Sequence, residues 1–206
     1  MCQLLETIKV RQNRLQNLDY HSDRVNSSRK ALFRSTDRWD LSQFITVPDL
    51  DPDKTYRCRF LYSRNVEQTE FLPYTPRIIQ KLLLIYADQL DYAFKYANRE
   101  ALEAIKQFAS QEQDTDVLIV KNGLITDTSF SNIVFFNGTH WVTPALPLLN
   151  GTKRAYYLNK GLLTAQHIAP ADLEKFEYAR LINAMMDLEE SPDIPIRNIY
   201  STPILM

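Results

Sequence analysis

Glycine and cysteine are both scarce in this chain, which has four glycines and two cysteines in 206 residues. Two cysteines cannot form a disulfide-rich scaffold, and Cys2 and Cys58 lack the spacing of metal-binding cysteines. No run of roughly 18 apolar residues occurs, so no transmembrane helix is predicted. The first residues also lack a basic segment followed by an apolar one, which predicts no signal peptide. We therefore expect a cytoplasmic protein with reduced cysteines and no membrane partner.

A surplus of positive charge is missing as well. The chain has 24 lysines and arginines against 25 aspartates and glutamates, which gives a formal net charge of −1. This balance argues against nucleic acid as a partner, and an anionic ligand would have to be bound by local positive charge. The three histidines lie far apart in the sequence. Because no HExxH, Walker, GxGxxG or GxSxG motif is present, we predict no metal site and none of the chemistry that those motifs mark.

The residues that are present are typical of a globular protein, with 45% hydrophobic side chains. Alternating or continuous apolar segments predict strands at residues 4–10, 55–62, 66–73, 79–86, 117–120, 124–126, 132–136, 140–143, 166–168 and 178–183. Helical spacing and stop signals predict helices at residues 22–33, 40–47, 99–110, 152–159 and 170–175. The mixture of strand meanders and helices indicates an α+β fold. We predict a smaller domain over residues 1–77 and a larger domain over residues 78–206.

A candidate anion site lies at Gly151, Thr152, Lys153 and Arg154, where a proline-containing loop leads into a predicted helix. The first turn of a helix has unpaired backbone amides that bind anions. Cations at that end oppose the helix dipole unless an anion binds beside them. The alternative is a turn followed by a basic first helical turn without a ligand, and the sequence leaves both possibilities open.

Two further positions could take part in chemistry. Lys95 lies between Phe94 and Tyr96, after a predicted strand and before a predicted helix. Partial desolvation there would lower the pKa of the lysine and supply the neutral amine that Schiff-base chemistry needs. The alternative is a surface lysine whose aliphatic stem covers apolar neighbours. Asp127 lies in a hydroxyl-rich loop before Asn132, where its carboxylate could orient a cationic ring or only bond its own turn.

Taken in order, these segments resemble the class IV aminotransferase family, which includes branched-chain and D-amino acid aminotransferases and aminodeoxychorismate lyase. In motif detail the chain is most similar to the lyase. The matching segments are His21-Ser22-Asp23-Arg24 for an H-x-x-R motif, Lys95-Tyr96-Ala97-Asn98-Arg99 for K-x-x-N-R, Thr126-Asp127 through Asn132 for T-E-x-x-x-x-N, Thr143-Pro144 with Gly151-Thr152-Lys153 for a phosphate-binding loop and helix, and Asn183-Ala184-Met185 for N-A-L/M. The resemblance covers nearly the whole chain.

The resemblance implies a two-domain fold like that of D-amino acid aminotransferase, with pyridoxal 5'-phosphate as cofactor. Lys95 would be the catalytic residue and form the covalent link to the cofactor. The implied cofactor-binding residues are Arg24, Arg99, Asp127, Asn132, Gly151, Thr152, Lys153, Asn183, Ala184 and Met185. Candidates for binding the carboxylates of a substrate are Thr7, Lys9, Arg57 and Arg59. A homodimer is expected, acting on a small amine and carboxylate substrate.

The sequence departs from the family pattern at two places. Asp127 stands where the family usually has glutamate, so its side chain is one methylene shorter and reaches less far toward a pyridine nitrogen. The family's first strands, which precede the strand that begins at Leu4, are also expected to be missing, which implies a reduced small domain.

Three functions remain open from the sequence. The leading hypothesis is a lyase that eliminates pyruvate from aminodeoxychorismate and leaves 4-aminobenzoate, a folate precursor. The second hypothesis is an amino acid aminotransferase of the branched-chain or D-amino acid type, which would use the same lysine. The third is a degenerate family member that binds a phosphorylated ligand without turnover.

Overall fold

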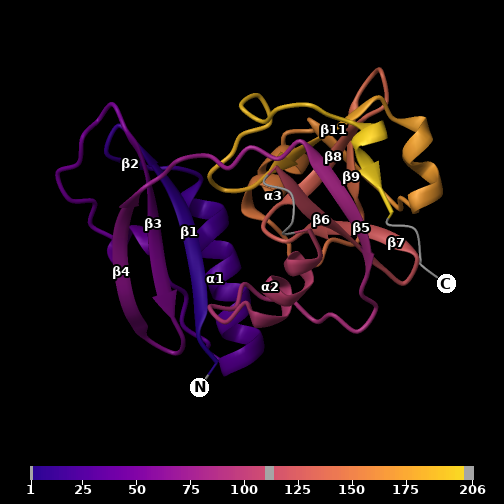
Figure 1. Ribbon diagram of the computed structural model, residues 1–206. Helices are drawn as coiled ribbons and strands as arrows, with labels where there is room; N and C mark the ends of the chain where they lie inside the picture. The colour runs from indigo at the N-terminus through magenta and orange to yellow at the C-terminus, as the bar shows by residue number, and fades with distance from the viewer. Residues whose placement is uncertain (1, 110–113, 202–206) are drawn as a thin grey trace. The chain divides into compact units, whose positions relative to one another are not determined.

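The computed structural model describes residues 2–109 and 114–201, and these form two compact units (Figure 1). The first unit runs to Pro76 and also includes Phe94–Asn98, and the second contains Arg77–Ala93 and the chain from Arg99 onward. The sequence-based division at residue 77 placed Lys95 in the larger domain, whereas the structure places it in the first unit. The reason is strand pairing, because the backbone amide of Leu5 donates to the carbonyl of Lys95 over 2.9 Å.

The first unit is a four-stranded antiparallel sheet with one helix along it. The strand order is β2 (Arg14–Leu15), β1 (Leu4–Arg11), β3 (Thr55–Tyr62) and β4 (Val66–Pro73). Helix α1 (Leu18–Phe33) runs alongside β1 in Figure 1. Alternate residues of the strands pack with α1 into a core of Leu4, Ile8, Val10, Val25, Phe33, Cys58, Phe60 and Tyr62. The strands predicted at residues 55–62 and 66–73 are confirmed with those bounds.

The second unit is built on a mixed sheet. Its strands run in the order β10 (Leu163–Gln166), β9 (Trp141–Pro144), β8 (Asn132–Phe136), β7 (Leu124–Thr128), β6 (Thr115–Lys121), β5 (Lys81–Tyr86) and β13 (Ile199–Tyr200). A further strand, β11 (Tyr178–Ile182), pairs with β8, and β12 (Ile194–Pro195) pairs with β11. Asn122 and Gly123, which have φ angles of 51° and 76°, form the hairpin turn between β6 and β7.

Two full α-helices belong to the second unit, α2 (Glu100–Lys106) and α3 (Thr152–Asn159). Helix α3 has the predicted bounds. The helix predicted at residues 99–110 is shorter, because α2 ends at Lys106 and a 3-10 turn, η2 (Gln107–Ala109), follows it. The tighter turn leaves Phe108 69% exposed, so it does not join Leu102 in the core, and Ser110 lies outside the described residues.

Three other predicted elements differ from the structure. The helix expected at residues 40–47 is only the 3-10 turn η1 (Leu41–Gln43), capped by the Asp40 carboxylate accepting from Ser42 N. The segment at residues 170–175 is also a 3-10 helix, η3 (Pro170–Lys175). The strand expected at residues 166–168 ends at Gln166, because β10 runs parallel to β9 in a register that begins with Leu163 opposite Trp141.

The structure therefore has mixed sheets with a few helices, the α+β class that the sequence predicts. Within the described part of the chain, no helix combines the length and the apolar character needed to cross a membrane.

Candidate active site

Lys95 is held against the edge of the first unit's sheet by its backbone. Leu4 and Tyr96 form an antiparallel bridge, and Ala97 N donates to Gln3 O over 2.9 Å. Lys95 is partly buried, and the rings of its two chain neighbours, Phe94 and Tyr96, are T-shaped to one another. The positive charge of Lys95 also helps to lower the pKa of His21. The predicted catalytic lysine is thus a partly desolvated cation near the H-x-x-R segment.

A buried charged cluster joins β1 to α1. Arg24 donates to both oxygens of the Glu6 carboxylate, with Nε–Oε1 at 2.9 Å and Nη2–Oε2 at 2.5 Å. His21 Nδ1 lies 2.6 Å from Glu6 Oε2. Burial acts to raise the pKa of Glu6, but Arg24 and His21 outweigh it and hold the pKa at about 2. Burial lowers the pKa of His21, with Glu6 acting in the opposite direction, so the histidine is neutral and Glu6 is ionised at pH 7.

Glu6 was not among the predicted site residues, although its sequence position carries a signal. It shares the inward face of β1 with Leu4, Ile8 and Val10, and it is fully buried. A charged residue on an otherwise apolar strand face is expected only where a partner neutralises it. Here the partner is Arg24, so the predicted phosphate-binding arginine already balances one buried carboxylate.

The four candidates for substrate carboxylates lie together on the opposite face of the same sheet. The register pairs Thr7 with Arg59 and Lys9 with Arg57, so all four side chains leave one face. Arg59 forms an ion pair with Glu70 on β4, which neutralises part of this positive surface.

In the second unit, Asp127 and Asn132 stand directly opposite each other across β7 and β8. The four residues between them form a closed turn, in which Thr128 N donates to Ser131 O over 2.9 Å. Residues opposite each other in an antiparallel pair have their side chains on one face. The five-residue spacing of the motif is therefore the spacing that lets Asn132 Nδ2 donate to Asp127 Oδ1 over 2.8 Å.

Asp127 is a buried carboxylate that no lysine or arginine contacts directly among the described residues. Its other oxygen, Oδ2, accepts from Leu149 N over 2.9 Å. Burial raises the pKa of Asp127 to about 6, and the Leu149 amide, Asn132 and the charge of Arg154 offset only part of that increase.

The start of α3 packs against the same asparagine. A Cβ at Gly151 would lie 1.9 Å from Asn132 Oδ1, so only glycine fits at this helix N-cap. Both cations of the first helical turn bind other parts of the protein. Lys153 forms an ion pair with Asp187, and Arg154 Nη2 donates to Pro144 O over 2.8 Å. These pairings explain how cations are accommodated at a helix N-terminus. Thr152 is buried beside them, and Gly151, Thr152 and Lys153 stay predicted cofactor-binding residues.

The last two motifs also lie beside this cluster. Ile182, the final residue of β11, pairs with Asn132, so Asn183 begins a turn next to it, in which Asn183 Oδ1 accepts from Met185 N over 2.8 Å. Arg99 Nη2 donates to Ser129 O over 2.8 Å and so braces the turn between Asp127 and Asn132. Its Nε is buried without a hydrogen-bond partner in the described parts of the chain.

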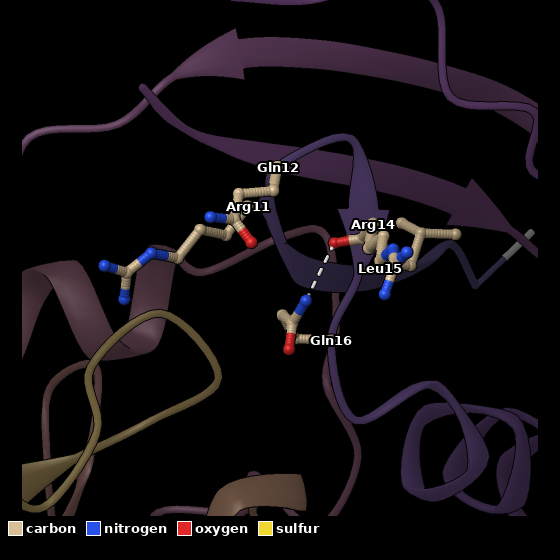
Figure 2. Close-up of a pocket in the computed structure, with 5 residues that line it drawn as sticks. All are labelled: Arg11, Gln12, Arg14, Leu15 and Gln16. Atoms are coloured by element: carbon tan, nitrogen blue, oxygen red, sulfur yellow. Dashed lines mark hydrogen bonds between the residues drawn. The ribbon is translucent and has the colours of Figure 1, made fainter. Parts of the chain in front are cut away.

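In the first unit, an open pocket of about 540 Å³ lies at the β1–β2 hairpin (Figure 2). Its lining residues are Arg11, Gln12, Arg14, Leu15 and Gln16, none of which was predicted as a site residue. Among residues 2–109 and 114–201, no three histidine, cysteine or acidic side chains are grouped as metal ligands would be.

Comparison with known proteins decides the family. A sequence model described as amino-transferase class IV matches residues 3–189 of the chain. The chain belongs to the class IV aminotransferase family. It is also 29% identical, over 190 residues, to an uncharacterized protein of Haemophilus influenzae, and the match covers 91% of this chain and all of that protein.

Solved structures agree with this assignment. A crystal structure of a candidate 4-amino-4-deoxychorismate lyase from Haemophilus somnus has a TM-score of 0.83 and 29% identity, covering 91% of this chain and 98% of that one. A hypothetical aminotransferase from Mycobacterium tuberculosis in its pyridoxal-phosphate-bound form has a TM-score of 0.70 at 18% identity, covering 98% of this class IV chain and 84% of that one. The second likeness concerns the fold alone.

The family depends on pyridoxal phosphate, and the residues of this chain fit that group in kind. An ionised carboxylate accepts about four hydrogen bonds, so Asp127, with its two side-chain-oxygen contacts to Asn132 and Leu149, retains acceptor capacity for a ring nitrogen. A cationic ring nitrogen would also favour the ionised carboxylate, and so offset the burial that raises the pKa of Asp127 to about 6. Each unit also has one further feature of the kind that the group requires, which is a glycine-led helix start in the second unit and a partly buried lysine in the first.

Proposed function

We propose that this class IV chain is a pyridoxal-phosphate-dependent lyase that eliminates pyruvate from aminodeoxychorismate and yields 4-aminobenzoate. The observation that carries the proposal is the arrangement around Asn132. It brings together a buried carboxylate, a glycine-led helix start and the Asn183-Ala184-Met185 turn, three motifs that lie far apart in sequence. The lyase assignment is supported by the K-x-x-N-R match at Lys95 and by the likeness to the Haemophilus somnus protein.

The residues are proposed to have the following tasks. Lys95 Nζ would hold the cofactor covalently until the substrate amine takes its place, and the freed amine would then accept the proton from the substrate α-carbon as general base. Asp127 binds the pyridine nitrogen, while Arg24, Thr152 and the backbone at Gly151 bind the phosphate. When bound, pyridoxal phosphate supplies an electron-accepting ring that stabilises the electron pair left on the substrate carbon.

The remaining predicted residues act less directly. Asn183, Ala184 and Met185 form the turn beside Asn132, and Arg99 supports the loop that follows Asp127. Thr7, Lys9, Arg57 and Arg59 stay the proposed partners of the substrate carboxylates, although Arg59 is paired with Glu70 and Lys9 is only 4% exposed. The family's expected homodimer is part of the proposal.

The test is to mix the purified protein with pyridoxal phosphate, reduce it with borohydride and map the modified peptide by mass. Modification of Lys95, and its loss in Lys95→Ala, is the expected result. A label on another lysine, or no label, would overturn the cofactor assignment.

The reaction is tested separately with aminodeoxychorismate and, in parallel, with D- or L-amino acids plus 2-oxoglutarate. Release of 4-aminobenzoate and pyruvate in the first assay is expected. Glutamate formation without aminobenzoate would identify an aminotransferase. Labelling of Lys95 without turnover in either assay would identify a ligand-binding member of the family that lacks activity.

A further inference from the structure

Asn132 occupies the point where four segments of the second unit meet. Its side-chain amide donates to Asp127 Oδ1 over 2.8 Å and to Leu149 O over 3.0 Å. The other side-chain atom, Oδ1, packs against Gly151, where an added Cβ would lie only 1.9 Å from it. Its backbone pairs with Ile182, the residue before the Asn183 turn. Asn132 is 5% exposed, so these protein groups take up its surroundings.

We infer that Asn132 is a positioning residue that holds the Asp127 carboxylate and the glycine-led start of α3 in one fixed arrangement. The amide has two donor hydrogens, and the contacts to Asp127 and Leu149 use both of them. Its role is therefore to align the groups that bind a ligand, not to donate to the ligand itself. The role in cofactor binding rests on the proposed function, whereas the alignment of Asp127 and α3 does not.

Asn132 links two ends of the proposed cofactor site. Asp127 is assigned to the ring nitrogen and the start of α3 to the phosphate, so their separation must match the length of the ligand. Leu149 reinforces the link, because its carbonyl accepts from Asn132 while its amide donates to Asp127 Oδ2 over 2.9 Å. One side chain thus ties the carboxylate, the preceding loop and the helix start together.

The close approach at Gly151 offers a direct test of the packing. All three of the nearest atoms to a Cβ at Gly151 belong to Asn132, at 1.9, 3.0 and 3.7 Å. Gly151→Ala alone is expected to lower Tm by about 2 to 10 °C through overpacking. In an Asn132→Ala background, Gly151→Ala should lower Tm only slightly, because the side-chain amide atoms that it would clash with are absent. Equal Tm losses in both backgrounds would overturn the link to α3.

The link between Asn132 and Asp127 is tested by titrating Asp127 in the protein without cofactor, using carboxyl-carbon NMR. The groups that face this carboxylate are the Asn132 amide, the backbone amides of Leu148 and Leu149, and the charge of Arg154. Asn132→Ala removes a donor that favours the ionised form, so the pKa of Asp127 should rise from its value of about 6. An unchanged titration would overturn the link to Asp127.

Ligand binding separates the two links. The probes are pyridoxal phosphate and its analogue with carbon in place of the ring nitrogen. Asn132→Ala should lower the affinity for pyridoxal phosphate by about tenfold. It should lower the affinity for the carbon analogue less, because that analogue makes no hydrogen bond to Asp127. Equal losses for both probes would contradict a role through the carboxylate.

Ser191→Ala is the matched control. Ser191 Oγ accepts from Leu181 N over 3.0 Å, so the variant also loses a buried hydrogen bond of the second unit, but one in which Asn132, Asp127, Leu149 and Gly151 take no part. It should lower Tm without moving the Asp127 titration or the ratio of the two affinities. If the unaltered protein binds neither probe, the proposed function fails, while the Tm cycle and the titration still decide the role of Asn132.

Discussion

Two buried carboxylates, one in each unit, have pKa values displaced in opposite directions. Glu6 is fully buried and Asp127 is 4% exposed, so the cost of burial acts on both. Glu6 has a bidentate arginine and a histidine as partners, and its pKa is held at about 2. Asp127 has an amide side chain and backbone amides, and its pKa is about 6.

The difference follows from the partners, because Glu6 has a bidentate arginine, whereas the donors to Asp127 are amides and Arg154 acts on it only through its charge. Glu6 already has its cation from Arg24 within the chain. Asp127 lacks an equivalent partner in the described structure, which is the arrangement expected of a carboxylate that binds a cationic ligand. The comparison therefore indicates a structural task for Glu6 and supports the ligand-binding task that we propose for Asp127.

Removing the cation from the first pair should have the largest effect. Arg24→Met leaves Glu6 buried beside a neutral histidine, which should destabilise the fold by about 3–5 kcal/mol. Urea unfolding at pH 7 measures the loss. A change below about 1 kcal/mol would mean that Glu6 is protonated or solvated, and the contrast with Asp127 would disappear.

The second expected effect is a loss of stability in acid that depends on Glu6. Its folded pKa of about 2 lies below the value of 4.5 for an unperturbed glutamate, so its contribution is present above pH 4.5 and is lost as the pH falls toward 2. The difference corresponds to about 3 kcal/mol. Unfolding measured from pH 5 to pH 2 should show this slope in the unaltered protein and a weaker one in Glu6→Gln.

Asp127 should give a slope of opposite sign in a different pH range. Its folded pKa of about 6 lies above 3.8, so the native state binds the proton more tightly and stability falls as the pH rises from about 4 to 6. His21 has a lowered pKa, so its titration changes the stability in the opposite direction over a neighbouring pH range. The quantity to measure is therefore the difference in stability between the unaltered protein and Asp127→Asn. Identical pH profiles for the two proteins would contradict the raised pKa.

The smallest effect is expected at the exposed pair between Arg59 and Glu70, whose side chains are 34% and 28% exposed. Ion pairs near solvent contribute about 0–1 kcal/mol, so Arg59→Gln should change the free energy of unfolding by no more than that. The same urea measurement in 0.05 M and 0.5 M salt provides the control, because screening should remove what remains. A larger loss of unfolding free energy in Arg59→Gln would show that the difference in burial does not explain why the Glu6–Arg24 pair contributes more than the Arg59–Glu70 pair.

Local patterns predicted much of the framework. The alternation at residues 55–62 and 66–73 identified β3 and β4, and the glycine-led segment identified α3. The elements that were wrong are short, such as η1 and η2, where a few residues of helical spacing do not specify whether a 3-10 turn or a full helix forms. Of the candidate site, motif order supplied Lys95, Arg24 and Asp127 as positions, and their roles in binding remain proposals.

The sequence alone determined the order and spacing of the motifs. In one case, from Asp127 to Asn132, the spacing also predicts how the two side chains are arranged. Five residues from Asp127 to Asn132 are enough for a hairpin that sets the two side chains opposite each other. Only the tertiary structure decided which partners each charge meets. Lys153 binds Asp187, and Glu6 lies between His21 and Arg24. These pairings join separate elements, so they depend on how strands and helices pack and not on any local periodicity.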